Sequence, residues 1–146
     1  MLAGRPLRVL LVDDSAADRL LTRACLEDAK VVIDLVEVDD GEAALEYLQR
    51  CDARDLPDLI LLDLNMPRVS GIEVLEELEK DEQLKTIPVV VLTSSSADRD
   101  IVATYELGAN CLVTKPVDLT QFEQIVRNIA DFWFMVVRLP SGANPG

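Results

Sequence analysis

The sequence predicts an α/β fold, a (βα)5 three-layer sandwich in which helices cover both faces of one parallel sheet. Short runs rich in Val, Ile and Leu alternate with stretches at helical spacing along the whole chain. Two of the runs, Leu59–Leu62 and Val89–Leu92, are apolar without interruption, which is typical of strands buried on both faces. Right-handed crossovers between such strands favour a doubly wound sheet in the order 2-1-3-4-5.

The predicted strands are short, apolar and bounded by turn-forming residues. They are Arg8–Val12, Val31–Val38, Asp58–Leu62, Pro88–Leu92 and Cys111–Val113. The second strand alternates apolar and polar residues, as in VIDLVEVD, so we expect it at an edge of the sheet. The predicted order 2-1-3-4-5 is the flavodoxin-like one, in which binding sites lie at the carboxyl ends of the strands.

Amphipathic helices are predicted between the strands and after the last one. They are Ser15–Ala29, Gly41–Arg50, Gly71–Lys80, Asp98–Leu107 and Asp118–Val137. The first opens with the capping pattern Ser-x-x-Asp, and Gly108 is suited to end the fourth. Two acidic segments, Glu37–Glu46 and Glu73–Glu82, are interpreted as solvated helix faces. Gly71 is interpreted as a backbone position that requires glycine.

Length and charge limit the possible functions. With 146 residues, 49% of them hydrophobic, we expect one domain over residues 1–146, with a core at about 8–137 and a short tail at 138–146. The net charge of −13 repels a polyanion, which argues against nucleic-acid binding. The sequence has no apolar run of the roughly 18 residues that span a bilayer. We therefore expect a cytoplasmic protein that does not bind a membrane.

The residue types present also limit the chemistry. The sequence contains no histidine, which excludes Ser-His and Cys-His nucleophile pairs and a histidine general base. Its three cysteines, Cys25, Cys51 and Cys111, lack metal-site spacing and are interpreted as buried or half-exposed thiols. Any reaction must therefore depend on carboxylates, hydroxyls and lysine.

Polar residues with matching chemistry follow four of the predicted strands. Asp13 and Asp14 follow the first strand, Asp63 the third, Thr93 the fourth and Lys115 the fifth. Each alone has an ordinary explanation as a helix cap or a solvated charge, but together they are expected to converge at one edge of the sheet. Three adjacent carboxylates repel one another unless a cation binds between them, and Mg²⁺ prefers such oxygen ligands.

This set of residues suits phosphoryl transfer. Once a metal ion neutralises the acidic cluster, one carboxylate can attack phosphorus and form an acyl phosphate. Thr93 and Lys115 would then contact the phosphoryl oxygens, because positioning and charge neutralisation supply most of the catalysis in such reactions.

Four motifs resemble those of the response-regulator receiver family, and the resemblance covers residues 8 to about 137. They are VLLVDDS at 9–15, DLILLDLNMPRVSG at 58–71, PVVVLTSS at 88–95 and TKP at 114–116. The resemblance implies that Asp63 accepts a phosphoryl group from a partner histidine kinase. It implies a cis peptide bond between Lys115 and Pro116, and contacts from Thr93 and Lys115 to the phosphoryl group.

The resemblance also implies a set of metal contacts. Asp14 and Asp63 would bind Mg²⁺ together with the backbone carbonyl of Asn65, and Asp13 would hold a metal-bound water. Among receivers, the chain is similar to small regulators that serve phytochrome-type histidine kinases. This similarity rests on DDSAADRLLTR, GANCLVTKPVDLTQF and DFW at 131–133.

Two features bear on how a signal leaves the domain. Leu112 occupies a position where most receivers carry an aromatic switch residue, and Tyr105 is a possible substitute. The end of the last predicted helix is apolar on every side, which predicts a homodimer through that helix and Phe132, Trp133 and Phe134. The competing interpretation is that the tail folds back over this patch.

The leading hypothesis is therefore a stand-alone response regulator, a phosphoacceptor switch with weak self-catalysed phosphorylation and dephosphorylation rather than a turnover enzyme. The alternative is a Mg²⁺-dependent phosphohydrolase with an aspartyl nucleophile, which would need a substrate pocket or cap that no long insertion supplies. A scaffold without phosphoryl chemistry would require that metal binding be absent.

Overall fold

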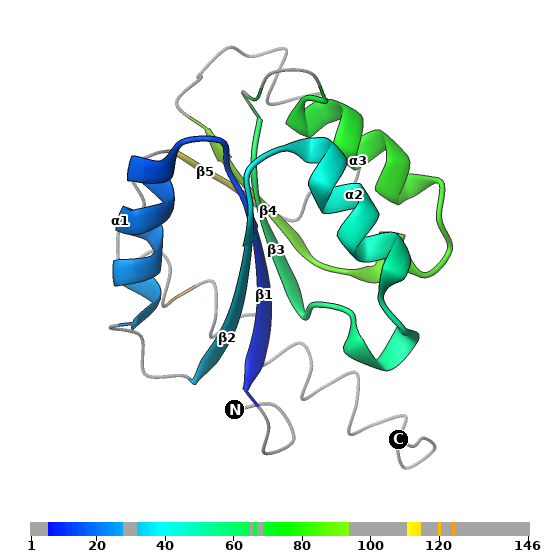
Figure 1. The fold of residues 1–146 in the computed structure, drawn as a ribbon, viewed down its shortest axis with the longest axis horizontal. Coiled ribbons are helices and arrows are strands. Elements are labelled where there is room, and N and C mark those ends of the chain that lie inside the picture. Colours follow the sequence, from blue (N-terminus) through cyan, green and yellow to red (C-terminus); the bar gives the residue numbers. More distant parts are fainter. Residues whose placement is uncertain are drawn as a thin grey trace.

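A five-stranded parallel sheet forms the centre of the protein (Figure 1), in the predicted order β2-β1-β3-β4-β5. The structure, a computed structural model, describes residues 6–27, 32–64, 66, 69–93, 111–114, 120 and 124. The strands are β1 Leu7–Val12, β2 Ile33–Val38, β3 Leu59–Asp63, β4 Val89–Thr93 and β5 Cys111–Thr114. The alternating strand β2 lies at an edge of the sheet, as its pattern predicts.

Helices cover both faces of this sheet (Figure 1), with α1 on one face and α2 and α3 on the other. Their bounds are α1 Ala16–Glu27, α2 Gly41–Arg50 and α3 Gly71–Glu79, within one or two residues of the predicted ends. Of the last two predicted helices, only Thr120 and Gln124 are described, and both are helical. The rest of those helices lies outside the described residues. No described helix has the length and apolar character needed to cross a membrane.

The core has two layers, because successive side chains of a strand point to opposite faces. Leu10, Val12, Ile60 and Leu62 pack with residues of α2 and α3 in one layer. The intervening strand residues pack with Leu26 of α1 in the other. All five residues of β3 are buried, which confirms the prediction of a strand covered on both faces.

Helix caps explain where α2 and α3 begin. The Asp40 carboxylate accepts a hydrogen bond from the backbone N–H of Ala43 at 2.7 Å. Ser70 and Glu73 form a reciprocal capping box at the start of α3. Glu37 belongs to β2 and its side chain is only 21% exposed, so the interpretation of Glu37–Glu46 as a solvated helix face is wrong for this residue. The acidic segment therefore begins in β2, before the helix that its charge pattern indicates.

Candidate metal and phosphoryl site

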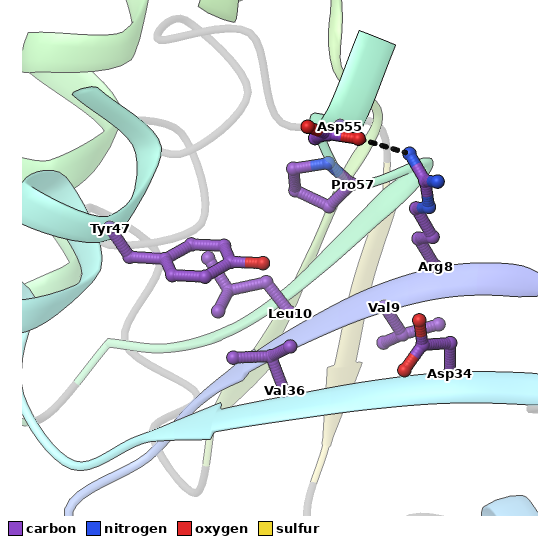
Figure 2. A pocket seen from close by; sticks show the side chains of 8 residues that line it. All are labelled: Arg8, Val9, Leu10, Asp34, Val36, Tyr47, Asp55 and Pro57. Carbon is purple, nitrogen blue, oxygen red and sulfur yellow. Dashed lines mark ion pairs between the residues drawn. The ribbon is translucent and has the colours of Figure 1, made fainter. Parts of the chain in front are cut away.

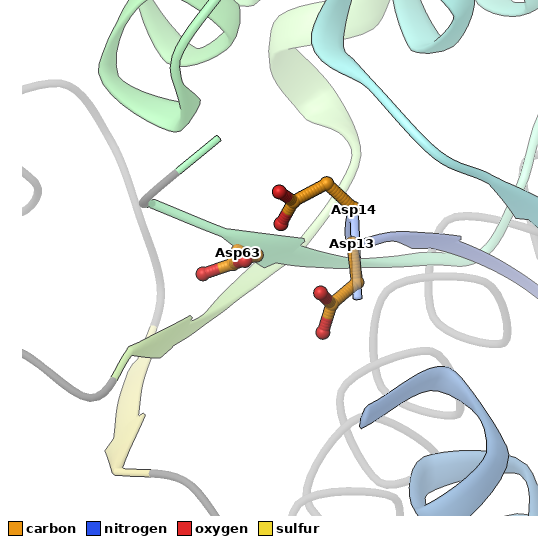
Figure 3. A group of neighbouring side chains, drawn as sticks. All are labelled: Asp13, Asp14 and Asp63. Atoms are coloured by element: carbon orange, nitrogen blue, oxygen red, sulfur yellow. The ribbon is translucent and has the colours of Figure 1, made fainter. Parts of the chain in front are cut away.

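Three predicted site residues meet at the carboxyl end of the sheet. Asp13 and Asp14 directly follow β1, and Asp63 is the last residue of the neighbouring strand β3. One carboxylate oxygen from each residue lies within 4.8 Å of the other two. Figure 3 shows the three side chains near one another at the ends of β1 and β3. The convergence predicted from the strand pattern is therefore present for these three carboxylates.

The three carboxylates differ in exposure. Asp13 is fully buried and Asp63 is 3% exposed, whereas Asp14 is exposed to solvent. The backbone N–H of Asp13 donates to the carbonyl of Val38 at 3.2 Å. Its Oδ1 accepts from the backbone N–H of Ser15 at 3.0 Å. Hydrogen bonds with Val38, at the end of β2, and with Ser15, just before α1, thus hold Asp13 in place. The exposed side chain of Asp14 leaves the cluster open to solvent.

The donor set fits a hard divalent cation. All three side chains offer carboxylate oxygens, which Mg²⁺ and Mn²⁺ bind, and the described cluster contains no thiolate or imidazole. Two buried negative charges beside a third repel one another strongly unless a cation compensates them. The exposed side at Asp14 leaves room for water ligands and for an oxygen of a phosphate, as Mg²⁺ sites require.

Gly71 brings the start of α3 directly against the end of β3. A Cβ atom on Gly71 would lie 2.5 Å from the backbone oxygen of Asp63 and 2.6 Å from Cα of Leu64. The N–H of Gly71 also donates to the carbonyl of Leu64 at 3.1 Å. The prediction that this position requires glycine has a physical reason in this close approach, which positions the backbone that carries Asp63.

The remaining predicted site residues are only partly described. Thr93 is the last residue of β4, and its register partner is Thr114, the residue that precedes Lys115. The side chain of Thr93, and Asn65 and Lys115 as a whole, lie outside the described residues. Their contacts to the metal or to a phosphoryl group stay predictions. The same holds for the side chain of Leu112, whose backbone belongs to β5.

The structure adds two residues that the sequence analysis did not place at the site. Arg19, in the first turn of α1, donates from Nη1 to the backbone oxygen of Asp13 at 2.7 Å. Its Nε lies 3.4 Å from a carboxylate oxygen of Glu37. The alternation of β2 contained a signal for Glu37, because Ile33, Leu35 and Glu37 share the face that α1 covers.

A second arginine completes this group. Arg23 binds the Glu37 carboxylate through two hydrogen bonds, of 2.7 Å from Nε and 2.9 Å from Nη2. The hydrogen bond from Arg23 holds the pKa of Glu37 below its ordinary value, although partial burial acts in the opposite direction. The same hydrogen bond raises the pKa of Arg23.

A pocket lies at the opposite, amino end of the strands (Figure 2). Its volume is about 210 Å³, and its lining includes Arg8, Asp34, Tyr47 and Asp55. Arg8 pairs with Asp55 at 3.7 Å, and burial is the main cause that raises the pKa of Tyr47. None of the predicted site residues lines this pocket, so it is separate from the acidic cluster.

The side chains of two of the three cysteines are described. Cys25 and Cys51 are thiols of intermediate exposure, which confirms the prediction for these two residues. The side chain of Cys111 lies outside the described residues.

Comparisons with known proteins agree with this geometry. Response regulator Rcp1 from Synechocystis sp. is 42% identical over 139 residues, which cover 93% of this chain and 95% of Rcp1. A crystal structure of the Mn(2+)-bound form of Rcp1 has a TM-score of 0.71, with 42% identity over 88% of this chain and 94% of that one.

A second solved structure, the phosphorylated cyanobacterial phytochrome response regulator RcpA, has a TM-score of 0.74. It is 41% identical and covers 91% of this chain and 97% of its own. Residues 9–127 match the family described as the response regulator receiver domain, a family of phosphoacceptor switches. The fold, the acidic cluster and these similarities together show that the chain belongs to the response regulator receiver domain family.

Proposed function

We propose that Asp63 is the phosphoacceptor of this receiver domain and that its partner histidine kinase supplies the phosphoryl group. The observation that carries the proposal is the place of Asp63 in the acidic cluster. Asp63 ends the buried strand β3, and a carboxylate oxygen lies within 4.8 Å of oxygens from Asp13 and Asp14. A nucleophile at that position is shielded by the fold but reachable from the exposed side of the cluster.

The reaction is a transfer between two nucleophiles. A carboxylate oxygen of Asp63 attacks the phosphorus of the partner's phosphohistidine. The new O–P bond forms as the P–N bond breaks, and the electron pair of the broken bond stays on the imidazole nitrogen. The product is an aspartyl phosphate, a mixed anhydride of the kind formed by aspartyl-phosphate enzymes. Water would later cleave the O–P bond, and we propose that this self-catalysed dephosphorylation is weak.

The acidic cluster prepares this reaction by holding a divalent cation, which we propose to be Mg²⁺. Bound there, the cation offsets the negative charge of the carboxylates and of the entering phosphoryl group. Asp14, Asp63 and the backbone carbonyl of Asn65 would bind it, and Asp13 would orient a water ligand. The all-oxygen donor set supports the proposal, as does the Mn(2+)-bound form of the similar Rcp1.

Thr93 and Lys115 complete the proposed site from the next two strands. Thr93 ends β4, which is paired with β3, and Lys115 follows Thr114 at the end of β5. Hydroxyl and ammonium groups at those positions would contact the phosphoryl oxygens and neutralise their charge. The phosphorylated state would then act through protein contacts. Because Leu112 is not aromatic, it cannot act as the usual aromatic switch residue, so the signal would leave the domain by another route.

The proposed partner is a phytochrome-type histidine kinase, and the proposed organisation is one receiver domain over residues 1–146 that acts alone. The similarity to RcpA, described as a phytochrome response regulator, supports the first point. The near-complete coverage of both chains in the comparison with Rcp1 supports the second. The cytoplasmic location and the absence of nucleic-acid binding stay predictions from the sequence.

The test uses acetyl phosphate as a small phosphoryl donor. Incubation of the chain with acetyl phosphate and Mg²⁺ should add the mass of one phosphoryl group, measured by intact-protein mass spectrometry. The Asp63→Asn variant should gain nothing, and chelation of the metal should prevent the gain. Asp58→Asn is the matched control, because Asp58 is an equally buried aspartate outside the cluster. A gain that persists in Asp63→Asn would refute the assignment, whereas continuous phosphate release would indicate a phosphohydrolase.

We also propose a homodimer through the last helix and Phe132, Trp133 and Phe134, and these three residues lie outside the described residues. The apolar sequence of this segment supports the proposal. Light scattering should give the mass of a dimer for the wild-type chain and of a monomer for Trp133→Asp. A wild-type monomer both with and without acetyl phosphate would exclude this interface.

A further inference from the structure

We propose that Arg19 is a positioning residue for the metal site, because it holds the peptide group that joins Asp13 to Asp14. This inference rests on the proposed function and assigns the site a residue outside the acidic cluster. The Nη1 atom of Arg19 donates to the backbone oxygen of Asp13 at 2.7 Å. The side chain is 21% exposed, so the bond is largely shielded from water.

The position of this hydrogen bond makes it effective. The carbonyl of Asp13 belongs to the planar peptide group whose nitrogen is that of Asp14, so its orientation affects both residues. On its other side, Asp13 donates its own N–H to Val38 at 3.2 Å. Arg19 therefore fixes the peptide group that joins the buried Asp13 to the exposed Asp14. The carboxylates of both residues must point toward the same ion.

The side chain of Arg19 is itself held in place by Glu37. Its Nε lies 3.4 Å from Glu37, and Glu37 is bound in turn by Arg23 at 2.7 Å. The pKa of Glu37 lies below its ordinary value, chiefly through the hydrogen bond from Arg23, so its carboxylate is charged near neutral pH. The guanidinium of Arg19 can bridge the ends of β1 and β2 because it offers donors in several directions.

A positioning role and a simple charge effect predict opposite results. If Arg19 acted only through its positive charge, removing that charge would strengthen the attraction of the acidic cluster for a cation. If Arg19 positions the Asp13–Asp14 peptide, removing the hydrogen bond should weaken cation binding. Arg19→Met keeps a long side chain without donor or charge. Arg19→Lys keeps the charge but cannot reproduce the planar fork.

The experiment is calorimetric titration of the metal-free chain with Mg²⁺ and with Mn²⁺. Because loss of a supporting contact typically weakens metal binding 10- to 100-fold, we expect about a tenfold loss in Arg19→Met. We expect a smaller loss in Arg19→Lys. Arg23→Met is the matched control, since its two hydrogen bonds to Glu37 lie one contact further from Asp13 than the bond from Arg19, and the metal affinity of this variant should stay within about threefold of wild type.

A second measurement needs no metal. Backbone amide hydrogen exchange of the metal-free chain should be faster in Arg19→Met than in wild type at Ser15, whose N–H donates to the Asp13 carboxylate, with unfolding free energies recorded for both. Equal or tighter Mg²⁺ binding by Arg19→Met, or unchanged exchange, would overturn the positioning role while leaving the proposed function intact. Failure of the wild-type chain itself to bind Mg²⁺ or Mn²⁺ would instead refute the proposed function, and this inference with it.

Discussion

The two ends of β3 carry aspartates that are equally buried but differ in their surroundings. Asp58, just before the strand, and Asp63, its last residue, are each 3% exposed. At the amino end, the Arg8 N–H donates to the Asp58 carboxylate at 2.9 Å and the Asp58 N–H donates to the Arg8 carbonyl at 2.8 Å. At the carboxyl end, Asp63 lies beside two more carboxylates. Burial of an acid therefore does not identify the site, whereas the gathering of like charges does.

This difference has a physical basis. A carboxylate that accepts backbone hydrogen bonds replaces its lost hydration and serves the fold. Three carboxylates within one small volume raise the free energy of the folded state unless a cation enters. Asp58 at the amino end thus stabilises the folded state. The carboxylates at the carboxyl end destabilise the metal-free folded state, and the same charges attract a cation.

The largest effect is expected from crowding the carboxyl end, in Gly71→Ala. The new methyl group would meet the Asp63 backbone, so unfolding free energy should fall by about 1–3 kcal/mol. Mg²⁺ affinity should fall by about tenfold as Asp63 is displaced. Gly41→Ala is a matched control, because its Cβ would lie 2.5 Å from the backbone oxygen of Val69 instead. Denaturant unfolding and calorimetry measure both effects, and equal Mg²⁺ affinities in the two variants would contradict the prediction.

Metal-linked stability should distinguish the two ends next. Mg²⁺ at about ten times its dissociation constant should raise the unfolding free energy of wild type by about 1.4 kcal/mol, because the ion binds only the folded state. The rise should be much smaller in Asp63→Asn and unchanged in Asp58→Asn. Thermal unfolding with and without Mg²⁺ provides the measurement. If Mg²⁺ raised the unfolding free energy of Asp63→Asn as much as that of wild type, the ion would have to bind elsewhere.

Without metal, the same two substitutions should change stability in opposite directions. Asp63→Asn should raise the unfolding free energy by about 1 kcal/mol, the scale of two unit charges about 4 Å apart in water. Asp58→Asn should lower it by about 1 kcal/mol, because a charge-assisted hydrogen bond from the Arg8 N–H becomes a neutral one. Urea unfolding in a chelating buffer would show this, and a change of the same sign in both variants would remove the distinction.

The smallest effect concerns Glu37, an acid whose charge is matched by arginines instead of crowded by acids. Its pKa in the folded chain lies below the ordinary 4.5, mainly through the Arg23 hydrogen bond. The resulting stabilisation is therefore present above about pH 4.5 and lost as pH falls through the folded-state pKa. The stability difference between wild type and Glu37→Gln should shrink accordingly when unfolding is measured from about pH 7 to pH 3.

Glu82 is the control for this pH dependence. Its side chain is 90% exposed and pairs only with Lys85 among the described residues, so Glu82→Gln should show little of this change. A difference between wild type and Glu37→Gln that stays constant over the whole pH range would show that the pairing with Arg23 does not stabilise the fold.

Much of the fold followed from local patterns. The uninterrupted run at Leu59–Leu62 and the alternation in β2 predicted a covered central strand and an edge strand, and both predictions are confirmed. The meeting of Asp13, Asp14 and Asp63 was also predictable, because the carboxyl ends of parallel strands must share one edge of the sheet. A repeating sequence pattern is sufficient to predict the position of a side chain where the geometry of its own strand or helix determines that position.

The sequence by itself thus determined the sheet order and the chemistry at its edge. Only the tertiary structure decided that Asp58 is held by Arg8, that Gly71 packs against Asp63, and that Arg19 contacts both Glu37 and the Asp13 carbonyl. These contacts join residues from different elements, through single side-chain orientations or a close approach of two backbones. Periodicity specifies the face on which a residue lies, whereas the packing of the elements selects the atom that it touches.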